Sequence, residues 1–416
     1  MADDDLDPLI TESDQPEPER AEPRAVGAER ERHAAAPPYR RRRIFALIGL
    51  ITVVALALLL GPKLFGGPKQ PADYTGEGSE DIVVEVHPGD SGSVIAENLV
   101  EKGVIAGADP FMTAARGNAA LAAIQPGYYK LRTEIPAATA VQKLIDPASR
   151  VGKLIIPEGK QLDDHQVIGS DSVNPGIFSL IADASCVDLN GSKKCVSAKD
   201  LKAAAGDGPL SSLNVPDWAT KGAGVMGQSH RRLEGLIAPG TWNIDPFASP
   251  KQILATLVAE SNDQYLRGGL LDAAKVLNLS PYEVLIVGSL VQKEAQPADF
   301  AKVARVIYNR LANWYDRLEF DSTVNYPLDR RELATTDADR HTETPWNTYA
   351  KSGLPATPIC SPGADALNAA EQPEPGDWLY FVTVDANGTT LFTSDYQQHL
   401  ANREKALNSG ILNSGR

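Results

Sequence analysis

The chain has 416 residues, 43% of them hydrophobic and 23% charged, which is enough for a buried core and for two or three domains. A net charge of −14 without a basic patch argues against nucleic acid as a partner. Three cysteines and six scattered histidines offer no metal-ligand spacing, so we expect neither a metal nor a cofactor.

The first segment predicts a membrane anchor. Residues 1–39 hold eleven acidic residues and four arginines and predict a disordered, acidic cytoplasmic tail. Residues 40–61 start with four arginines and continue with 18 uncharged residues, about 27 Å as a helix and enough to cross a bilayer. Because positive charge stays inside, we expect a single-pass anchor in the cell membrane, a linker at 62–80 and an extracytoplasmic remainder. A cleaved signal peptide is the weaker alternative, because the apolar run is long and a long tail precedes it.

The next segment, 81–150, predicts a small βααβ module. Its order is similar to a LysM-like module, a type that holds amino-sugar chains, but a purely structural βααβ unit is equally well supported. Apolar spacing and turn residues predict strands at 82–86 and 127–131 and helices at 91–102, 109–123 and 137–146.

A strand at 153–156 opens the larger exterior part, and the stretch from about 165 to 230 is rich in Gly, Ser, Asp and Asn. We therefore expect an irregular polar insertion there. Cys186 and Cys195 lie in it, on either side of an Asn-Gly turn, and outside the membrane a disulfide between them is expected. Cys360 has no evident partner and fits a buried small hydrophobe.

Helical spacing returns at 250–277, and a stronger helix signal begins at Ser280. Ser280, Pro281 and Glu283 form a capping box with proline at the first helical position. Glu294 falls on the apolar stripe of this helix, where burial disfavours the ionised carboxylate and raises its pKa, as suits a general acid. The alternative is a structural ion pair with Arg305 or Arg310.

Several blocks of sequence occur in the order typical of one family. The blocks are PEG (157–159), LEGLIAPGTW (233–242), SLVQKEA (289–295), VARVIYNRL (303–311), FDSTVNY (320–326), WNTYAKSGLPATPICSPG (346–363) and LYFV (379–382). In this ordered set the chain resembles the YceG-like family of endolytic murein transglycosylases, which implies a mixed α+β catalytic domain at 151–412.

The resemblance implies that Glu294 is the catalytic acid. Gln292 occupies the first acid position of the family motif, which leaves Glu294 as the only carboxyl group there. Ala356 and Thr390 also depart from the family pattern and put details of the substrate loops in doubt, not the class. For the substrate groove we expect Asp321, Ser322, Asn347 and Tyr349; their alternative role is to hold an irregular loop through hydrogen bonds to backbone.

The implied reaction cleaves the MurNAc–GlcNAc bond of nascent glycan strands and leaves 1,6-anhydroMurNAc ends, a step of cell wall biogenesis that one carboxyl group can perform. Expected partners are peptidoglycan strands, the cell membrane and cell wall synthases. The sequence lacks Ser-x-x-Lys, Lys-Thr-Gly, Gly-x-Ser-x-Gly and His-Glu-x-x-His, which disfavours transpeptidases, α/β-hydrolases and zincins. The remaining alternative is a non-catalytic, membrane-anchored scaffold that binds glycan.

Overall fold

The computed structural model describes residues 54–55, 72–116, 124–167, 170–313, 317–328 and 335–410. The chain divides into two compact units, Met1–Lys69 and Gln70–Arg416. The expected acidic tail and all but two residues of the expected anchor lie outside the described residues. Within the described part, no single helix is both long and apolar enough to span a membrane, although the bent helix pair Leu270–Leu277 and Pro281–Glu294 passes the same test together.

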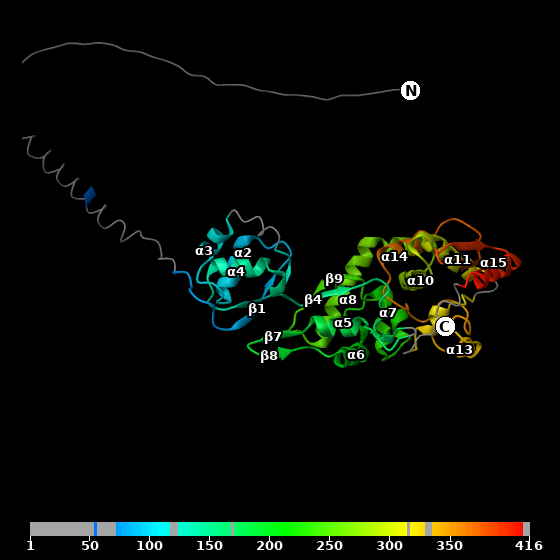
Figure 1. The fold of residues 1–416 in the computed structure, drawn as a ribbon, viewed down its shortest axis with the longest axis horizontal. Helices are drawn as coiled ribbons and strands as arrows, with labels where there is room; N and C mark the ends of the chain where they lie inside the picture. Colours follow the sequence, from blue (N-terminus) through cyan, green and yellow to red (C-terminus); the bar gives the residue numbers. More distant parts are fainter. Residues whose placement is uncertain are drawn as a thin grey trace, which may run out of the picture. The chain divides into compact units, whose positions relative to one another are not determined.

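The first folded part has a small core of its own, as the βααβ pattern predicts (Figure 1). Val84, Leu99, Phe111 and Leu131 are buried there between one sheet and three helices. The second helix ends earlier than expected, because Arg116 is extended. The elements are β1 (Asp81–Val86), α2 (Gly92–Glu101), α3 (Ala108–Ala115), β2 (Gly127–Arg132), α4 (Ala137–Ile145) and β3 (Arg150–Val151), with β2 central and antiparallel to both neighbours.

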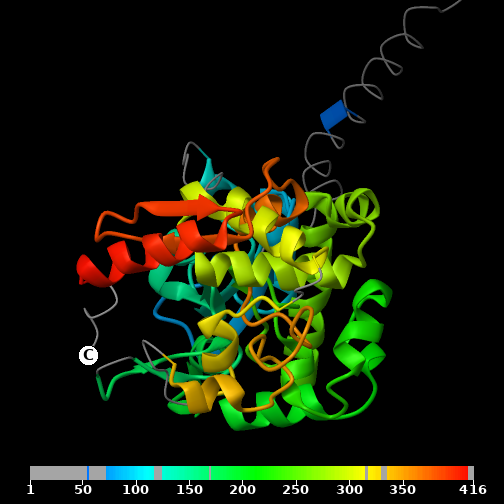
Figure 2. The ribbon, with the colours of Figure 1, turned by 90° about the vertical axis from the view of Figure 1, so that its right-hand side faces the viewer.

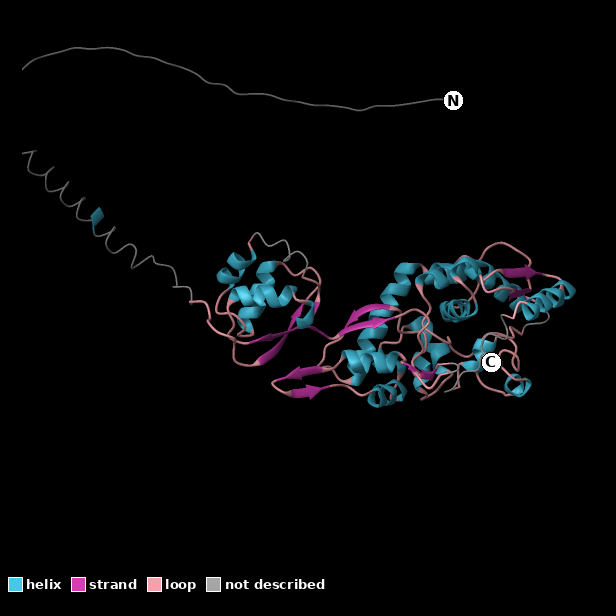
Figure 3. Cartoon of the chain, in the orientation of Figure 1, coloured by secondary structure: helices cyan, strands magenta, loops and turns pink. Residues whose placement is uncertain are grey.

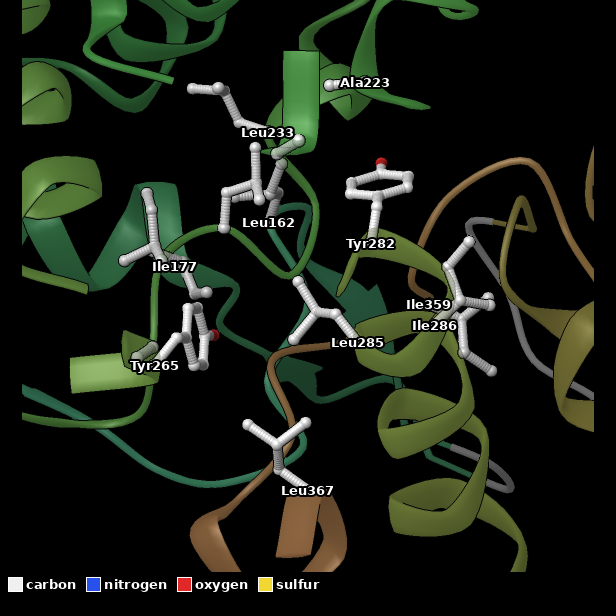
Figure 4. Close-up of a cluster of buried hydrophobic side chains, with 14 of the residues drawn as sticks. Leu162, Ile177, Ala223, Leu233, Tyr265, Tyr282, Leu285, Ile286, Ile359 and Leu367 are labelled. Carbon is white, nitrogen blue, oxygen red and sulfur yellow. The ribbon is translucent and has the colours of Figure 1, made fainter. Parts of the chain in front are cut away.

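The larger part is mainly helical, with strands only in short two-stranded pairs (Figure 3). Its core surrounds α10 (Pro281–Glu294), where Leu285 and Ile286 face Leu367 and Ile359 (Figure 4). The helical spacing at 250–277 is broken at Gly269, whose φ of 98° ends one helix and begins the next. The surrounding elements are β4 (Lys153–Ile156) paired with β9 (Gly240–Asn243), α8 (Pro250–Gly268), α9 (Leu270–Leu277), α11 (Phe300–Leu311) and α14 (Ala364–Glu371).

The prediction of an irregular stretch at 165–230 is wrong. Three short helices run through it, and Ile177, Ile181, Leu201 and Leu213 bury their side chains in the main core. The sulfur atoms of the two cysteines in this stretch are bonded at 2.06 Å. The elements are β5 (His165–Gln166), β6 (Val173–Asn174), α5 (Ile177–Ala184), β7 (Val187–Leu189), β8 (Ser192–Lys194), α6 (Ala198–Gly206), α7 (Asp217–Gly224) and the 3-10 turns η3 (Leu210–Leu213) and η4 (His230–Leu233).

The last part of the chain adds two short helices and a hairpin against the main core. The hairpin pairs β10 (Tyr380–Thr383) with β11 (Thr390–Thr393) and packs against α15 (Tyr396–Asn408), the red helix of Figure 2. Cys360 is fully buried, as expected for a small hydrophobe. The elements are α12 (Asp321–Asn325), α13 (Asp337–His341), β10 (Tyr380–Thr383), β11 (Thr390–Thr393) and α15 (Tyr396–Asn408).

Candidate active site

Helix α10 runs from the middle of the core to its edge and ends at Glu294. The helix begins with the predicted capping box: the Glu283 backbone N–H donates to Ser280 Oγ, and the Ser280 N–H donates to Glu283 Oε2 at 2.7 Å. Residues 284–291 are buried without interruption, whereas the last turn is only partly covered. A buried, capped helix therefore fixes the position of Glu294 at its carboxyl end.

The carboxyl group of Glu294 is poorly solvated. Part of the residue remains open to solvent, yet the surrounding protein desolvates the carboxyl group and raises its pKa from 4.5 to about 7. Contacts with the hydroxyl and the backbone N–H of Ser322 lower this pKa, and the negative charge of Asp321 raises it. A carboxyl group with a pKa near neutrality can both give and take a proton.

The alternative of a structural ion pair is wrong. The guanidinium of Arg305 donates to the backbone oxygen of Glu374 at 2.8 Å, and that of Arg310 donates to the backbone oxygens of Leu379 and Leu318. Among the described residues, no lysine, arginine or histidine lies within ion-pair distance of Glu294. Within the described part of the chain, the desolvated acid therefore has no cationic partner of the kind that a structural ion pair requires.

Three of the four expected groove residues gather around Glu294. Asp321 and Ser322 begin α12, and the Tyr349 hydroxyl donates to Asp321 Oδ1 at 2.8 Å. The Tyr349 pKa is raised by burial and by the charges of Asp321 and Glu294, so this hydroxyl keeps its proton. Thr335 donates to the same Asp321 oxygen at 2.7 Å, and the Arg340 guanidinium lies 3.3 Å from both carboxylate oxygens.

The Ser322 hydroxyl is the polar group of this cluster that lies beside the Glu294 carboxyl group. It lies near enough to Glu294 to lower the pKa of that carboxyl, but it reaches full hydrogen-bond geometry with no group in the described residues. Because its oxygen is buried, this hydroxyl faces the Glu294 carboxyl group and not solvent.

The expected substrate contact of Asn347 needs correction. Its side chain is 1% exposed; the amide nitrogen donates to three backbone oxygens, and the amide oxygen accepts from the Tyr349 N–H at 2.9 Å. No polar atom of the side chain is left for a substrate. Asn347 instead holds the loop that carries Tyr349, which is the alternative role that the sequence left open.

The two residues before Glu294 tie the helix end to neighbouring loops. Gln292 Oε1 accepts from the Gly363 N–H at 2.7 Å, and Lys293 Nζ donates to the backbone oxygen of Gly159. Gln292 thus serves as a backbone acceptor, a task that needs no acid. These bonds bring Gly159 of the PEG block and Gly363 of the 346–363 block beside the end of α10, although the two bonds span 134 and 71 residues of the chain.

A hollow of about 280 Å³ opens beside Glu294. One wall is the end of α10 with Gln296, and the other is the β10–β11 hairpin with Thr383, Asp385 and Gly388. The hairpin was not predicted from the sequence, although its Asp-Ala-Asn-Gly turn is a recognisable turn signal. No group of three or more His, Cys, Asp and Glu residues within the described ranges could hold a metal ion.

The site centres on one carboxyl group that can give and take a proton. The YceG-like family matches residues 84–405, so the chain belongs to this family. Over 360 residues it is 28% identical to the endolytic murein transglycosylase of Bacillus subtilis (strain 168), which covers 86% of this chain and 92% of that protein. Over 304 residues it is 28% identical to the endolytic murein transglycosylase of Streptococcus pneumoniae (strain D39), covering 69% of this chain and 52% of that one.

A crystal structure of a YceG-like protein from Listeria monocytogenes is also similar. Its sequence is 27% identical to this chain, and the superposition covers 77% of this chain and 99% of the other with a TM-score of 0.49.

Proposed function

We propose that this protein is an endolytic murein transglycosylase that cuts the MurNAc–GlcNAc bond inside peptidoglycan strands. The observation that carries the proposal is Glu294, a desolvated carboxyl group with a pKa of about 7, at the rim of an open hollow and without a cationic partner among the residues that the structure describes. The relatives that match over most of the chain bear the same activity in their names. A glycosidic bond needs a proton on its leaving oxygen, and this carboxyl group can supply it.

The reaction needs no water and no second carboxyl group. Protonated Glu294 gives its proton to the oxygen that links C1 of MurNAc to GlcNAc, and that C–O bond breaks. The C6 hydroxyl of the same MurNAc attacks C1, and Glu294 takes the hydroxyl proton back. The products are a GlcNAc with a free hydroxyl and a 1,6-anhydroMurNAc end. Because the nucleophile is part of the substrate, positioning supplies much of the rate.

Asp321, Ser322 and Tyr349 would shape the groove. The Ser322 hydroxyl lies beside Glu294 and would help to hold its carboxyl group in place. The Asp321 carboxylate raises the pKa of Glu294 and so favours the protonated acid before the bond breaks. Tyr349 orients Asp321 through its hydroxyl. The hairpin on the far side of the hollow offers Thr383 and Asp385 to the other sugar.

The surroundings of the enzyme form part of the same proposal. Residues 40–61 would anchor the chain in the cell membrane with the N-terminus in the cytoplasm, and the βααβ part would act as a LysM-like module on the same glycan. Cell wall synthases would be neighbours, because nascent strands are the substrate. The support is the arginine cluster before an apolar run and the order of the elements in the first folded part.

A strand-length assay tests the proposal. Purified full-length protein in detergent is incubated with uncross-linked glycan strands, and the strand lengths are followed over time. An internal cutter halves the mean length early and releases few disaccharides, whereas an enzyme that works from strand ends releases disaccharides at once. A glycan-binding scaffold, the alternative function, retains the strands on a column but leaves their length unchanged.

A further inference from the structure

Glu234 is a second buried carboxyl group, and it takes no part in the proposed reaction. It is 1% exposed and directly follows η4. Its Oε2 accepts a hydrogen bond from the Tyr326 hydroxyl at 2.7 Å and another from the Leu162 backbone N–H at 3.2 Å. One carboxyl group thus joins three segments that are far apart in the sequence, and the third of them is the end of α12.

Tyr326 is linked directly to the active site. Its backbone N–H donates to the backbone oxygen of Ser322 at 3.0 Å, which closes the single turn of α12. The Tyr326 ring is 5% exposed, so it cannot move without repacking the core. Whatever fixes this tyrosine also fixes Ser322 and Asp321 one turn earlier, opposite Glu294.

An arginine and a tryptophan hold the same tyrosine from its other sides. The Arg231 guanidinium lies 4.9 Å from the Tyr326 ring centre and 5.2 Å from that of Trp346, and the two rings meet edge to face at 5.0 Å. Asp163 fixes Arg231 in turn, because the Asp163 carboxylate accepts a hydrogen bond from Arg231 Nε at 3.2 Å. Trp346 directly precedes Asn347, the residue that holds the Tyr349 loop.

We propose that Glu234 is a positioning residue of this enzyme, which acts through Tyr326 to hold α12 against the catalytic acid. The assignment rests on the proposed function and deepens it. One largely buried clamp joins the LEG block to α12 and to the loop that carries Tyr349; it consists of Glu234, Tyr326, Trp346 and the partly exposed Arg231. Simple core filling does not explain it, because an apolar residue would fill the same space without burying a carboxyl group.

The test removes one hydroxyl group from the full-length enzyme. Tyr326→Phe keeps the ring and deletes the hydrogen bond to Glu234. We expect kcat to fall roughly tenfold, the size typical of a lost hydrogen bond to a carboxylate, with KM nearly unchanged. Looser packing of α12 would admit water to Glu294, so the alkaline limb of the pH profile should move to lower pH. A merely structural tyrosine does not move that limb.

Tyr308→Phe is the matched control. The Tyr308 hydroxyl donates to the backbone oxygen of Ala370 at 2.7 Å and lies on α11, away from α12. The control should keep the parent kcat and pH profile even where its melting temperature falls.

Glu234→Gln provides a second, independent variant. The amide keeps one acceptor oxygen for the two donors, so kcat of Glu234→Gln should fall by no more than that of Tyr326→Phe. Because both changes break the same contact, kcat of the double variant should equal that of the poorer single variant. Additive losses, or a Tyr326→Phe enzyme that behaves like Tyr308→Phe, would overturn the assignment. A parent enzyme that forms no anhydro ends would instead refute the proposed function, and the assignment with it.

Discussion

Replacing Glu294 with glutamine separates catalysis from stability. The amide has nearly the shape of the carboxyl group, so the fold and the Ser322 contact should survive. The variant cannot give or take a proton at this position. Activity should therefore fall by at least the roughly 10²–10⁴-fold that general acid–base catalysis contributes, with no other carboxyl group on the helix end to replace it.

The same substitution should raise the free energy of unfolding, but only at a pH above the ordinary pKa of a glutamate. The ordinary pKa of 4.5 rises to about 7 in the folded chain, so as the pH increases the unfolded chain releases this proton first. Stability is lost between about pH 4.5 and 7, and the full penalty of ionising the buried acid applies above that range. The upper limit of the penalty is about 3 kcal/mol, which solvent reaching the partly exposed residue reduces.

The assay combines chemical denaturation at pH 5 and pH 8 with glycan cleavage. Glu294→Gln should match the parent at pH 5, exceed it at pH 8 and lack cleavage at both. Glu371→Gln is the control, because Glu371 is also buried with a pKa raised to about 7 but lies on α14, outside the hollow. It should show the same pH-dependent gain with full activity. Retained activity in Glu294→Gln, or a stability gain equal at both pH values, would refute the reasoning.

Three further results are expected. Asn347→Ala should lower the free energy of unfolding by about 3 kcal/mol, because it orphans several buried backbone groups, and an unchanged denaturation midpoint would show that water replaces them. Without reductant, mass analysis of the denatured, exported protein should find Cys186 and Cys195 bridged and only Cys360 alkylated; three alkylated thiols would contradict the bridge. A reporter fused after residue 80 should face the exterior, and a cytoplasmic signal would overturn the proposed topology.

Local signals predicted the central helix well. The capping box at Ser280 and the apolar stripe ending at Glu294 depend on residues within one segment, and the structure has both. The break at Gly269 was also local but was overlooked, because apolar spacing continues across it. By contrast, the helices of 165–230 are short and place only two or three side chains each in the core, too few for periodicity to stand out from a polar composition.

The surroundings of Glu294 depend on contacts between distant segments. Its neighbour Ser322 lies in a five-residue helix and Tyr349 in a loop, and local patterns place neither of them; only the family resemblance brought them together. The role of Asn347 could not be decided from sequence, because an asparagine suits a groove and a loop equally well until its partners are known. The clamp around Glu234 was missed, since no local rule pairs that residue with Tyr326, 92 positions later.

The most direct test of the single-carboxyl mechanism is whether oxygen from water enters the new MurNAc ends. Glycan strands are digested in water enriched in heavy oxygen, and the new MurNAc ends are weighed by mass spectrometry. A transglycosylase that uses Glu294 twice predicts ends one water lighter than a reducing end and free of heavy oxygen. Heavy oxygen in a full reducing end would show that water attacks C1, as in a hydrolase, and would make Asp321 the first candidate for a second catalytic carboxylate.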